Sequence, residues 1–382
     1  MERLEIAKGL MLEFAKETGL EPAFHQRRYL WTDAFAVCAF FELYRKTADP
    51  SFKELALRLI HQVHWILGRH RSDDERKGWL SGLSEEEGLR HPTIGGSRIG
   101  KRLPERKENE PFDPRAEWDR DGQYFHYLTK WMHALIVAYR ETKYEQFVIW
   151  AYELAKTAFH AFSYEIHGRR LMYWKMSIDL KRPLVASMGQ HDPVDGLVTF
   201  LEIQSVSQMN GLDVDLFYEI RELARICEHL DLITDDPLGI GGLLFDATRT
   251  YQLLGSKFSP SKDLFWALLN AASFGLRDFI ASGELKRPAN MRLAFRELGL
   301  SIGLAGIEKI KSLKNLQKEE KKNDFQKIIH EILTYYTVKK EIEDFWIKRE
   351  NRKSGTWKEH KDINSVMLAV SLFPDAFLTI FD

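Results

Sequence analysis

The chain has 382 residues, and 56 acidic side chains balance its 55 basic ones, which gives a formal net charge of −1. This balance argues against a nucleic-acid-binding protein, which normally carries a basic excess, and the 44% apolar content suffices for a large core. The two cysteines suggest no disulfide framework and the first residues do not resemble a signal peptide, so we expect a soluble, cytoplasmic protein.

Helical periodicity dominates the sequence, with almost none of the two-residue alternation that strands show. Twelve helices are predicted, in chain order: Glu2–Thr18, Tyr29–Thr47, Ser51–Gly68, Asp121–Thr142, Glu145–Tyr164, Asp195–Asn210, Asp213–Leu232, Leu238–Leu254, Ser261–Ser282, Asn290–Ile310, Asp324–Arg349 and Asp362–Ile380. Ser51 with Glu54 fits a capping box, and Asp213 and Ser261 are typical N-cap residues. No linker-like composition divides the chain, so residues 1–382 are expected to form one domain.

A helical hairpin recurs early in the chain. Residues 29–59 align without a gap on residues 124–154, so that Tyr29 falls on Tyr124 and YRKT at 44–47 falls on YRET at 139–142. Helices beginning near residues 29, 121, 195, 238, 290 and 362 are apolar on nearly every face, whereas their partners keep a charged stripe. This alternation predicts an all-α fold, an (α/α)6 toroid of six inner and six outer helices.

The segments that lead into the inner helices are rich in Asp, His, Arg, Asn and Trp, whereas the turns at the opposite ends are plain. Because the inner helices of such a toroid run parallel, we expect their N-terminal ends to gather at one mouth. A long loop at about 69–120 leads into the second inner helix and is expected at the same mouth. Loops of more than about 15 residues are often lids or binding segments.

One stretch of this loop, GGSRIGK at 95–101, fits the GxxxxGK pattern of a phosphate loop. A phosphate loop also needs a preceding strand and a following helix, and Pro104 breaks the stretch where that helix should be. We therefore interpret the segment as a lid with a basic tip, at which Arg98 and Lys101 could meet an anionic group.

Clusters with the spacing of a metal site are incomplete. His61 and His64 lie about one helical turn apart without a third ligand, which favours structural histidines. The pairs Asp73–Asp74 and Asp235–Asp236 lack a spaced third carboxylate and are interpreted as solvated turns or N-caps. No metal and no cofactor is predicted.

The strongest functional signals are carboxylates among aromatic residues at the predicted mouth. Hydrolysis of a glycosidic bond needs two carboxyl groups from different elements, and indole faces stack on sugar rings. The candidate catalytic residues are Asp33, Asp121, Asp195, His126, His191 and His360. The candidate substrate-binding residues are Trp31, Arg71, Trp79, Arg98, Trp118, Arg120, Gln123, Arg292, Trp357 and Asn364.

Several motifs resemble the six-hairpin carbohydrate-active superfamily. MHAL at 132–135, followed by AYRET and WAYELAKTAF, is similar to the N-acylglucosamine 2-epimerase and cellobiose epimerase group, and so is GTWK at 355–358. That group implies a catalytic His about five residues after this Trp and then an Asn, whereas this chain has Asp362, Ile363 and Asn364 there and His360 is displaced. WTD at 31–33 with FELYRKTADPSFKELA resembles unsaturated glucuronyl and rhamnogalacturonyl hydrolases, which implies an acid/base aspartate acting on an anionic sugar.

Three functions remain open at this point. The first is a glycoside hydrolase-like enzyme acting on a sugar or short oligosaccharide, neutral or anionic, with Asp121 or Asp195 as general acid and Asp33 as its partner. The second is a sugar epimerase or isomerase in which the three candidate histidines move the proton. The third is a non-catalytic binding or scaffold protein whose acids are N-caps. The expected partner is a small sugar rather than nucleic acid or membrane, and a homo-oligomer is open because apolar faces of outer helices could pair.

Overall fold

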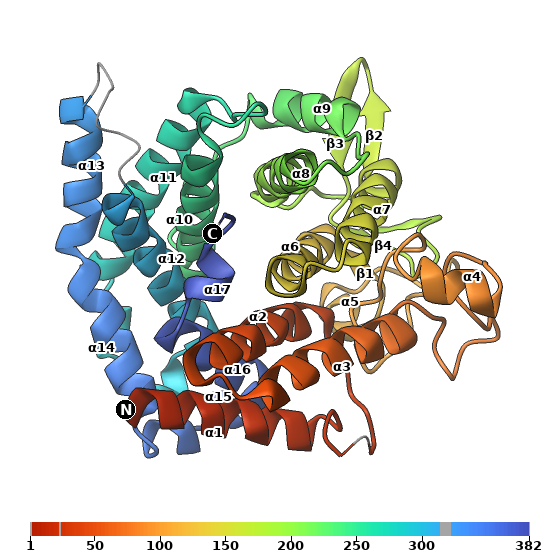
Figure 1. The fold of residues 1–382 in the computed structure, drawn as a ribbon, viewed down its shortest axis with the longest axis horizontal. Helices are drawn as coiled ribbons and strands as arrows, with labels where there is room; N and C mark the ends of the chain where they lie inside the picture. Colours follow the sequence, from red (N-terminus) through yellow and green to blue (C-terminus); the bar gives the residue numbers. More distant parts are fainter. Residues whose placement is uncertain (1, 23, 314–321, 382) are drawn as a thin grey trace. The chain divides into compact units, whose positions relative to one another are not determined.

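The computed structural model describes residues 2–22, 24–313 and 322–381, and most of them lie in helices, which confirms the predicted all-α class (Figure 1). The residues form two compact units. The N-terminal unit is Ala15–Leu230, and the C-terminal unit is Asp231–Asp382 together with Met1–Phe14.

The N-terminal unit contains three helical hairpins, α2–α3, α6–α7 and α8–α9. Its helices are α2 (Leu30–Thr47), α3 (Pro50–Leu67), α4 (Glu85–Arg90), α5 (Pro114–Asp119), α6 (Phe125–Thr142), α7 (Gln146–Phe162), α8 (Asp192–Met209) and α9 (Phe217–Cys227). The predicted inner helices α2, α6 and α8 pack side by side in chain order, as Figure 1 shows. Apolar and small residues cover most of their faces, so each helix is buried along most of its length.

The C-terminal unit is built around α12, which packs against α10, α14 and α16. Its helices are α10 (Pro237–Leu253), α11 (Lys262–Ala281), α12 (Ala294–Ser312), α13 (Lys322–Thr334), α14 (Tyr336–Ile347), α15 (Gly355–Glu359), α16 (Lys361–Leu372) and α17 (Asp375–Leu378). Short 3-10 turns are η1 (Glu284–Lys286), η2 (Ala289–Met291) and η4 (Asn351–Lys353). Helix α1 (Glu2–Glu17) contributes its residues up to Phe14.

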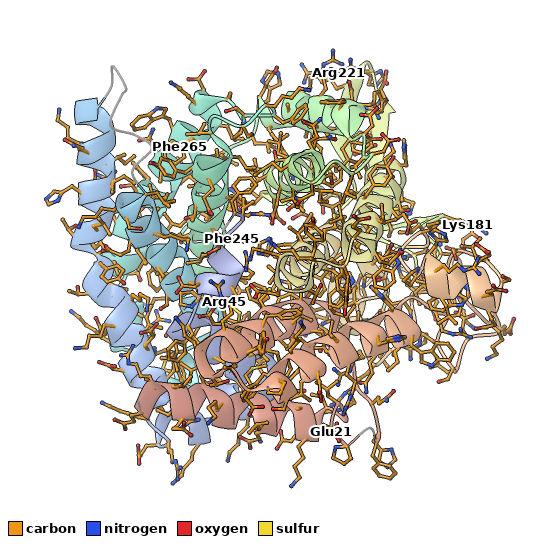
Figure 2. All side chains as sticks on the ribbon, viewed as in Figure 1. Glu21, Arg45, Lys181, Arg221, Phe245 and Phe265 are labelled. Carbon is orange, nitrogen blue, oxygen red and sulfur yellow. The ribbon has the colours of Figure 1, made fainter. Side chains whose placement is uncertain are left out.

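Glycines allow α10 and α12 to pack backbone against backbone. A Cβ atom at Gly241 would lie 2.2 Å from the carbonyl oxygen of Gly299, and one at Gly303 would lie 2.7 Å from that of Gly241. Only glycine fits such an approach, which explains the small-residue runs in both helices. The ring of Phe245 in α10, labelled in Figure 2, stacks on the ring of Phe377 of α17, with centroids 4.2 Å apart.

Short strands follow α7, in a segment for which no strand was predicted. The hairpin of β2 (Ser163–Ile166) and β3 (Arg169–Met172) turns at His167 and Gly168, which both have positive φ angles. A second, three-stranded sheet has the order β1–β4–β5, from β1 (Gln123–Tyr124), β4 (Lys175–Met176) and β5 (Pro183–Val185). The predicted helix start at Asp121 is therefore wrong: residues 123–124 pair with β4, and α6 begins only at Phe125.

Most other predicted helix boundaries agree with the structure to within a few residues. The helix predicted from Asp362 to Ile380 ends at Leu372, because Pro374 disfavours helix continuation. The predicted Asp324–Arg349 helix is two helices, α13 and α14, interrupted at Tyr335.

Two of the three predicted N-terminal caps are wrong. Helix α3 begins one residue before Ser51, and Asp49 caps it by accepting from the Ser51 amide, so the capping box does not form. Helix α9 begins at Phe217 rather than beside Asp213. The Ser261 cap is confirmed by its bond from the Leu264 amide, 3.1 Å long.

Among the described residues, one helix is long and apolar enough to cross a membrane. This helix is α11, and half of its apolar span is buried inside the protein. It packs against α10 and α13. A core helix of a soluble protein has the same properties, so the finding is consistent with a soluble protein.

Candidate functional site

The starts of the three inner helices of the N-terminal unit lie together. The hydroxyl of Tyr29, just before α2, is 2.7 Å from the hydroxyl of Tyr127 in the first turn of α6. His126, also in that turn, places its Nδ1 3.3 Å from the Oδ2 of Asp192, the first residue of α8. The residue before α2 and residues in the first turns of α6 and α8 are thus brought to one place.

Five rings gather at this place and are called the aromatic cluster: Tyr29, Tyr124, His126, Tyr127 and Trp174. The imidazole of His126 is nearly parallel to the indole of Trp174, with centroids 6.4 Å apart and an interplanar angle of 18°. The ring of Tyr124 lies 5.3 Å from both. The ring of Tyr124 is buried, whereas His126, Tyr127 and Trp174 are partly exposed and offer ring faces and polar edges suited to stacking against a small polar ring.

The tyrosines of the cluster are neutral. Burial raises the pKa of Tyr29 to about 12 and also raises the pKa values of Tyr124 and Tyr127 above those of an ordinary tyrosine. Their hydroxyl groups therefore act as hydrogen-bonding groups rather than as phenolate bases at neutral pH.

His126 and Asp192 form a partly exposed pair. The side chain of His126 is 29% exposed and that of Asp192 is 10% exposed. Among the described residues, only Nδ1 of this imidazole has a hydrogen-bonding partner. A carboxylate at one ring nitrogen fixes the orientation of the imidazole, while the other nitrogen can exchange a proton with a ligand.

Asp121, a predicted general acid, has a different environment. Its side chain is fully buried and accepts from Arg98 Nη1 at 2.6 Å, from Arg71 Nη1 at 3.2 Å and from the backbone amide of Gly100 at 2.9 Å. The amides of Lys101 and Gly122 add further bonds of 3.3 and 3.1 Å. This group, the Asp121 anchor, ties the loop at 69–120 to the turn that leads into β1.

Asp33 and Asp195 also lie beside cations. Asp33 accepts from the Tyr29 amide at 2.9 Å and from Arg28 Nη1 at 3.4 Å, in a buried setting. Asp195 accepts from Lys130 Nζ at 2.6 Å and from the hydroxyl of Thr129. Their predicted catalytic roles stay predictions, and the observed bonds give each carboxylate a structural partner.

The predicted substrate-binding residues of the N-terminal unit are mostly engaged within the protein. Arg98 donates to the carbonyls of Arg69 and Ile66 besides Asp121, and Arg71 also pairs with Asp73. Arg120 pairs with Glu110 at 2.9 Å. Of the three predicted stacking indoles here, Trp31 and Trp79 are buried in the core and Trp118 is 54% exposed.

The GxxxxGK segment is held by packing. Gln123 is buried, accepts from the Ser97 amide at 2.8 Å, and donates to two backbone carbonyls. A Cβ at Gly96 would lie 2.0 Å from the Gln123 side-chain oxygen, and one at Gly100 2.1 Å from the Arg28 carbonyl oxygen. Both glycines have positive φ angles, so this glycine pattern is required by the fold.

The remaining candidates, apart from His191, belong to the C-terminal unit. Arg292 forms a two-bond ion pair with Glu297, at 2.8 and 2.6 Å, and Asn364 accepts from the Phe295 amide at 2.9 Å. The Phe295 ring also lies 5.5 Å from the imidazole of His360. Trp357 is buried against Trp346. These contacts bring the starts of α12 and α16 together.

His191 belongs to the N-terminal unit and occupies the position before α8, next to Asp192.

Several residues of the site were not predicted from the sequence. Tyr29 and Tyr124 had a signal, because they coincide in the hairpin repeat. Asp192 lies beside the predicted His191, but the sequence does not show which of the two meets His126. Tyr127 and Trp174 carried no signal, since Trp174 reaches the site through the unpredicted strand segment.

Comparisons with known proteins give no family. A scan against protein-family models and searches of curated proteins and of solved structures found no match. Within the described residues, no group of three or more His, Cys, Asp or Glu side chains has the geometry to hold a metal ion.

Proposed function

We propose that this protein is a carbohydrate-active enzyme whose sugar ligand binds at the aromatic cluster, with His126 as the acid/base group and Asp192 as its positioning residue. The observation that carries the proposal is the 3.3 Å contact between His126 Nδ1 and the Asp192 carboxylate, set among the rings of Tyr124, Tyr127 and Trp174. Ring faces bind the apolar side of a sugar, and the hydroxyl groups of the tyrosines bind its edge.

The chemistry that this site supports best is proton transfer at a carbon next to the carbonyl of an open-chain sugar. This is epimerisation or isomerisation, in which an imidazole removes a proton from carbon and a proton is returned to the substrate. Support for it over hydrolysis comes from the candidate carboxylates Asp33, Asp121 and Asp195, each of which already bonds to a cationic side chain.

A glycoside hydrolase is the second candidate. It is favoured by Asp192 and Asp195, two carboxylates three residues apart in the first turn of α8 that both contact residues of α6. Hydrolysis leaves carbon-bound hydrogens in place, whereas epimerisation through proton transfer exchanges one with solvent.

The (α/α)6 toroid and a cytoplasmic location are part of the same proposal. The toroid is supported by the packing of consecutive inner helices within each unit: α6 packs against α2 and α8, and α12 packs against α10 and α16. A solution scattering profile of the full chain tests whether six hairpins close into one ring.

The test of the proposed chemistry is to incubate the protein in D₂O with a panel of free aldoses, ketoses and N-acetylated hexosamines, followed by NMR. Deuterium at one substrate carbon is expected with the wild type. His126→Asn should lose about 10²–10⁴-fold in rate, and Asp192→Asn should lose less. Release of a reducing sugar from glycosides without deuterium incorporation would favour the hydrolase instead.

The matched control is His160→Asn. His160 also lies near a carboxylate, with Nε2 3.5 Å from Glu219 Oε1, but it is 61% exposed and outside the aromatic cluster. Its variant should react like the wild type. Equal activity of the His126 and His160 variants on a substrate that the wild type converts would overturn the proposal.

A further inference from the structure

Lys101 borders the aromatic cluster, and its backbone is fixed. Its amide donates to Asp121 Oδ1 at 3.3 Å, and its carbonyl accepts from Arg71 Nη1 at 2.7 Å. The side-chain nitrogen lies 5.5 Å from the centre of the Tyr29 ring and 5.0 Å from the centre of the Trp118 ring. The Asp121 anchor therefore delivers an amine to the edge of the proposed sugar site.

This amine lacks an acceptor for its three N–H groups: among the described residues, no hydrogen bond or ion pair reaches Lys101 Nζ. Two other lysines differ: Lys175, which lies over the ring of Tyr124, and Lys130, in α6. Lys175 donates to the carboxylate and carbonyl of Glu117 and to the carbonyl of Arg120, each at 2.8 Å. Lys130 donates to Asp195 at 2.6 Å.

The Lys101 ammonium is partly desolvated, so its lack of a hydrogen-bond acceptor is energetically unfavourable. Burial lowers the pKa of Lys101, and the charge of Lys175 lowers it further, whereas Asp119 and Asp121 act in the opposite direction. Two aromatic faces stabilise the ammonium without accepting a conventional hydrogen bond. An incoming anion would supply both the opposite charge and the acceptors.

We propose that Lys101, between Tyr29 and Trp118, is the binding site for an anionic group of the ligand, a carboxylate or a phosphate carried by the sugar. This inference rests on the proposed function for the sugar part of the ligand. It specifies the substrate class as a sugar acid or a sugar phosphate. Because Tyr29 contacts both Lys101 and Tyr127, the same tyrosine links the anion site to the cluster around His126.

Titration calorimetry with glucose, glucuronate, glucose 6-phosphate and inorganic phosphate tests the inference. The wild type should bind at least one of the two charged sugars more tightly than glucose, and which one identifies the anion. Lys101→Met should weaken that binding about 10-fold or more, and Lys101→Arg should retain most of it. Binding of glucose itself should change little in both variants.

The control is Lys53→Met. Lys53 Nζ also lies over a tyrosine, 5.7 Å from the ring centre of Tyr44, at the opposite end of α2 from Tyr29. Its loss should leave all affinities unchanged. An equal loss in the Lys53 variant, an unchanged affinity in Lys101→Met, or no binding of any of the four probes by the wild type would overturn the inference.

The two proposals fail separately. If inorganic phosphate binds through Lys101 but no sugar binds or reacts, the anion site stands and the carbohydrate function falls. If a neutral sugar reacts through His126 and Lys101→Met does not affect any anionic sugar, the carbohydrate function stands and the anion site falls.

Discussion

The Asp121 anchor and the aromatic cluster both surround the segment that leads into α6, but their polar atoms are satisfied differently. At the anchor, a fully buried carboxylate receives five donors from two arginines and three backbone amides. At the cluster, His126 is partly exposed and one ring nitrogen has no partner among the described residues, and the same is true of the Lys101 amine. Buried charge with complete bonding supports the fold, whereas spare bonding capacity near solvent is available to a ligand.

The largest expected effect is on the anchor. Asp121→Asn removes the charge that compensates Arg98 and Arg71, and loss of one partner in a buried ion pair typically costs about 3–5 kcal/mol of unfolding free energy. Denaturant unfolding of the variant measures this. Asp119→Asn is the control, because Asp119 is exposed two residues away, and it should cost less than about 0.5 kcal/mol. A catalytic Asp121 would give the reverse pattern, with turnover lost and stability kept.

Gly100→Ala tests whether the glycine pattern of the loop serves the fold. Gly100 has a φ of 91°, and an added Cβ would lie 2.1 Å from the Arg28 carbonyl oxygen, so we expect a loss of about 3 kcal/mol. Gly82 has a φ of 74° but nothing within 4 Å of an added Cβ. Gly82→Ala should therefore cost only the backbone strain, about 1 kcal/mol. Equal unfolding midpoints for the two variants would exclude a packing role for Gly100.

The sequence predicts the helices well and the site poorly. Helix α2 starts within one residue of its predicted start because apolar periodicity is a local property. The pairing of Asp121 with Arg98, by contrast, joins residues 23 positions apart through a loop without periodicity. An aspartate near a tryptophan looks the same in the sequence whether it faces a ligand or two arginines. The residues Tyr29 and Tyr124 were visible only as a repeat, and Trp174 depends on strands whose pairing is not local.

His64 is also buried, like Asp121, but it must stay neutral in the folded protein. Its Nε2 accepts from the Trp131 indole at 3.1 Å, and burial, with a smaller effect of His61, lowers the pKa of His64 to about 3. An unfolded histidine has a pKa of about 6.5, so the unfolded state binds more protons between these values, and stability falls as the pH falls below about 6.5.

The expected loss is about 1.4 kcal/mol for each pH unit, or about 2 kcal/mol from pH 6 to 4.5. His64→Gln should remove this part of the pH dependence of unfolding. His61→Gln is the control, because His61 is exposed on the same helix, and it should keep the slope. Parallel stability curves for the wild type and His64→Gln would show that His64 is not the group responsible.

The smallest effect on stability is expected for His126→Asn, although its effect on turnover should be the largest. Its imidazole is partly exposed and its one bond, to Asp192, is 3.3 Å long, so truncation leaves no fully buried charge without a partner. We expect a change in unfolding free energy below about 0.5 kcal/mol, measured by the same denaturant unfolding as for Asp121→Asn. A loss of several kcal/mol would place His126 with the anchor, as part of the scaffold, and would remove the physical distinction on which its assignment as the acid/base group depends.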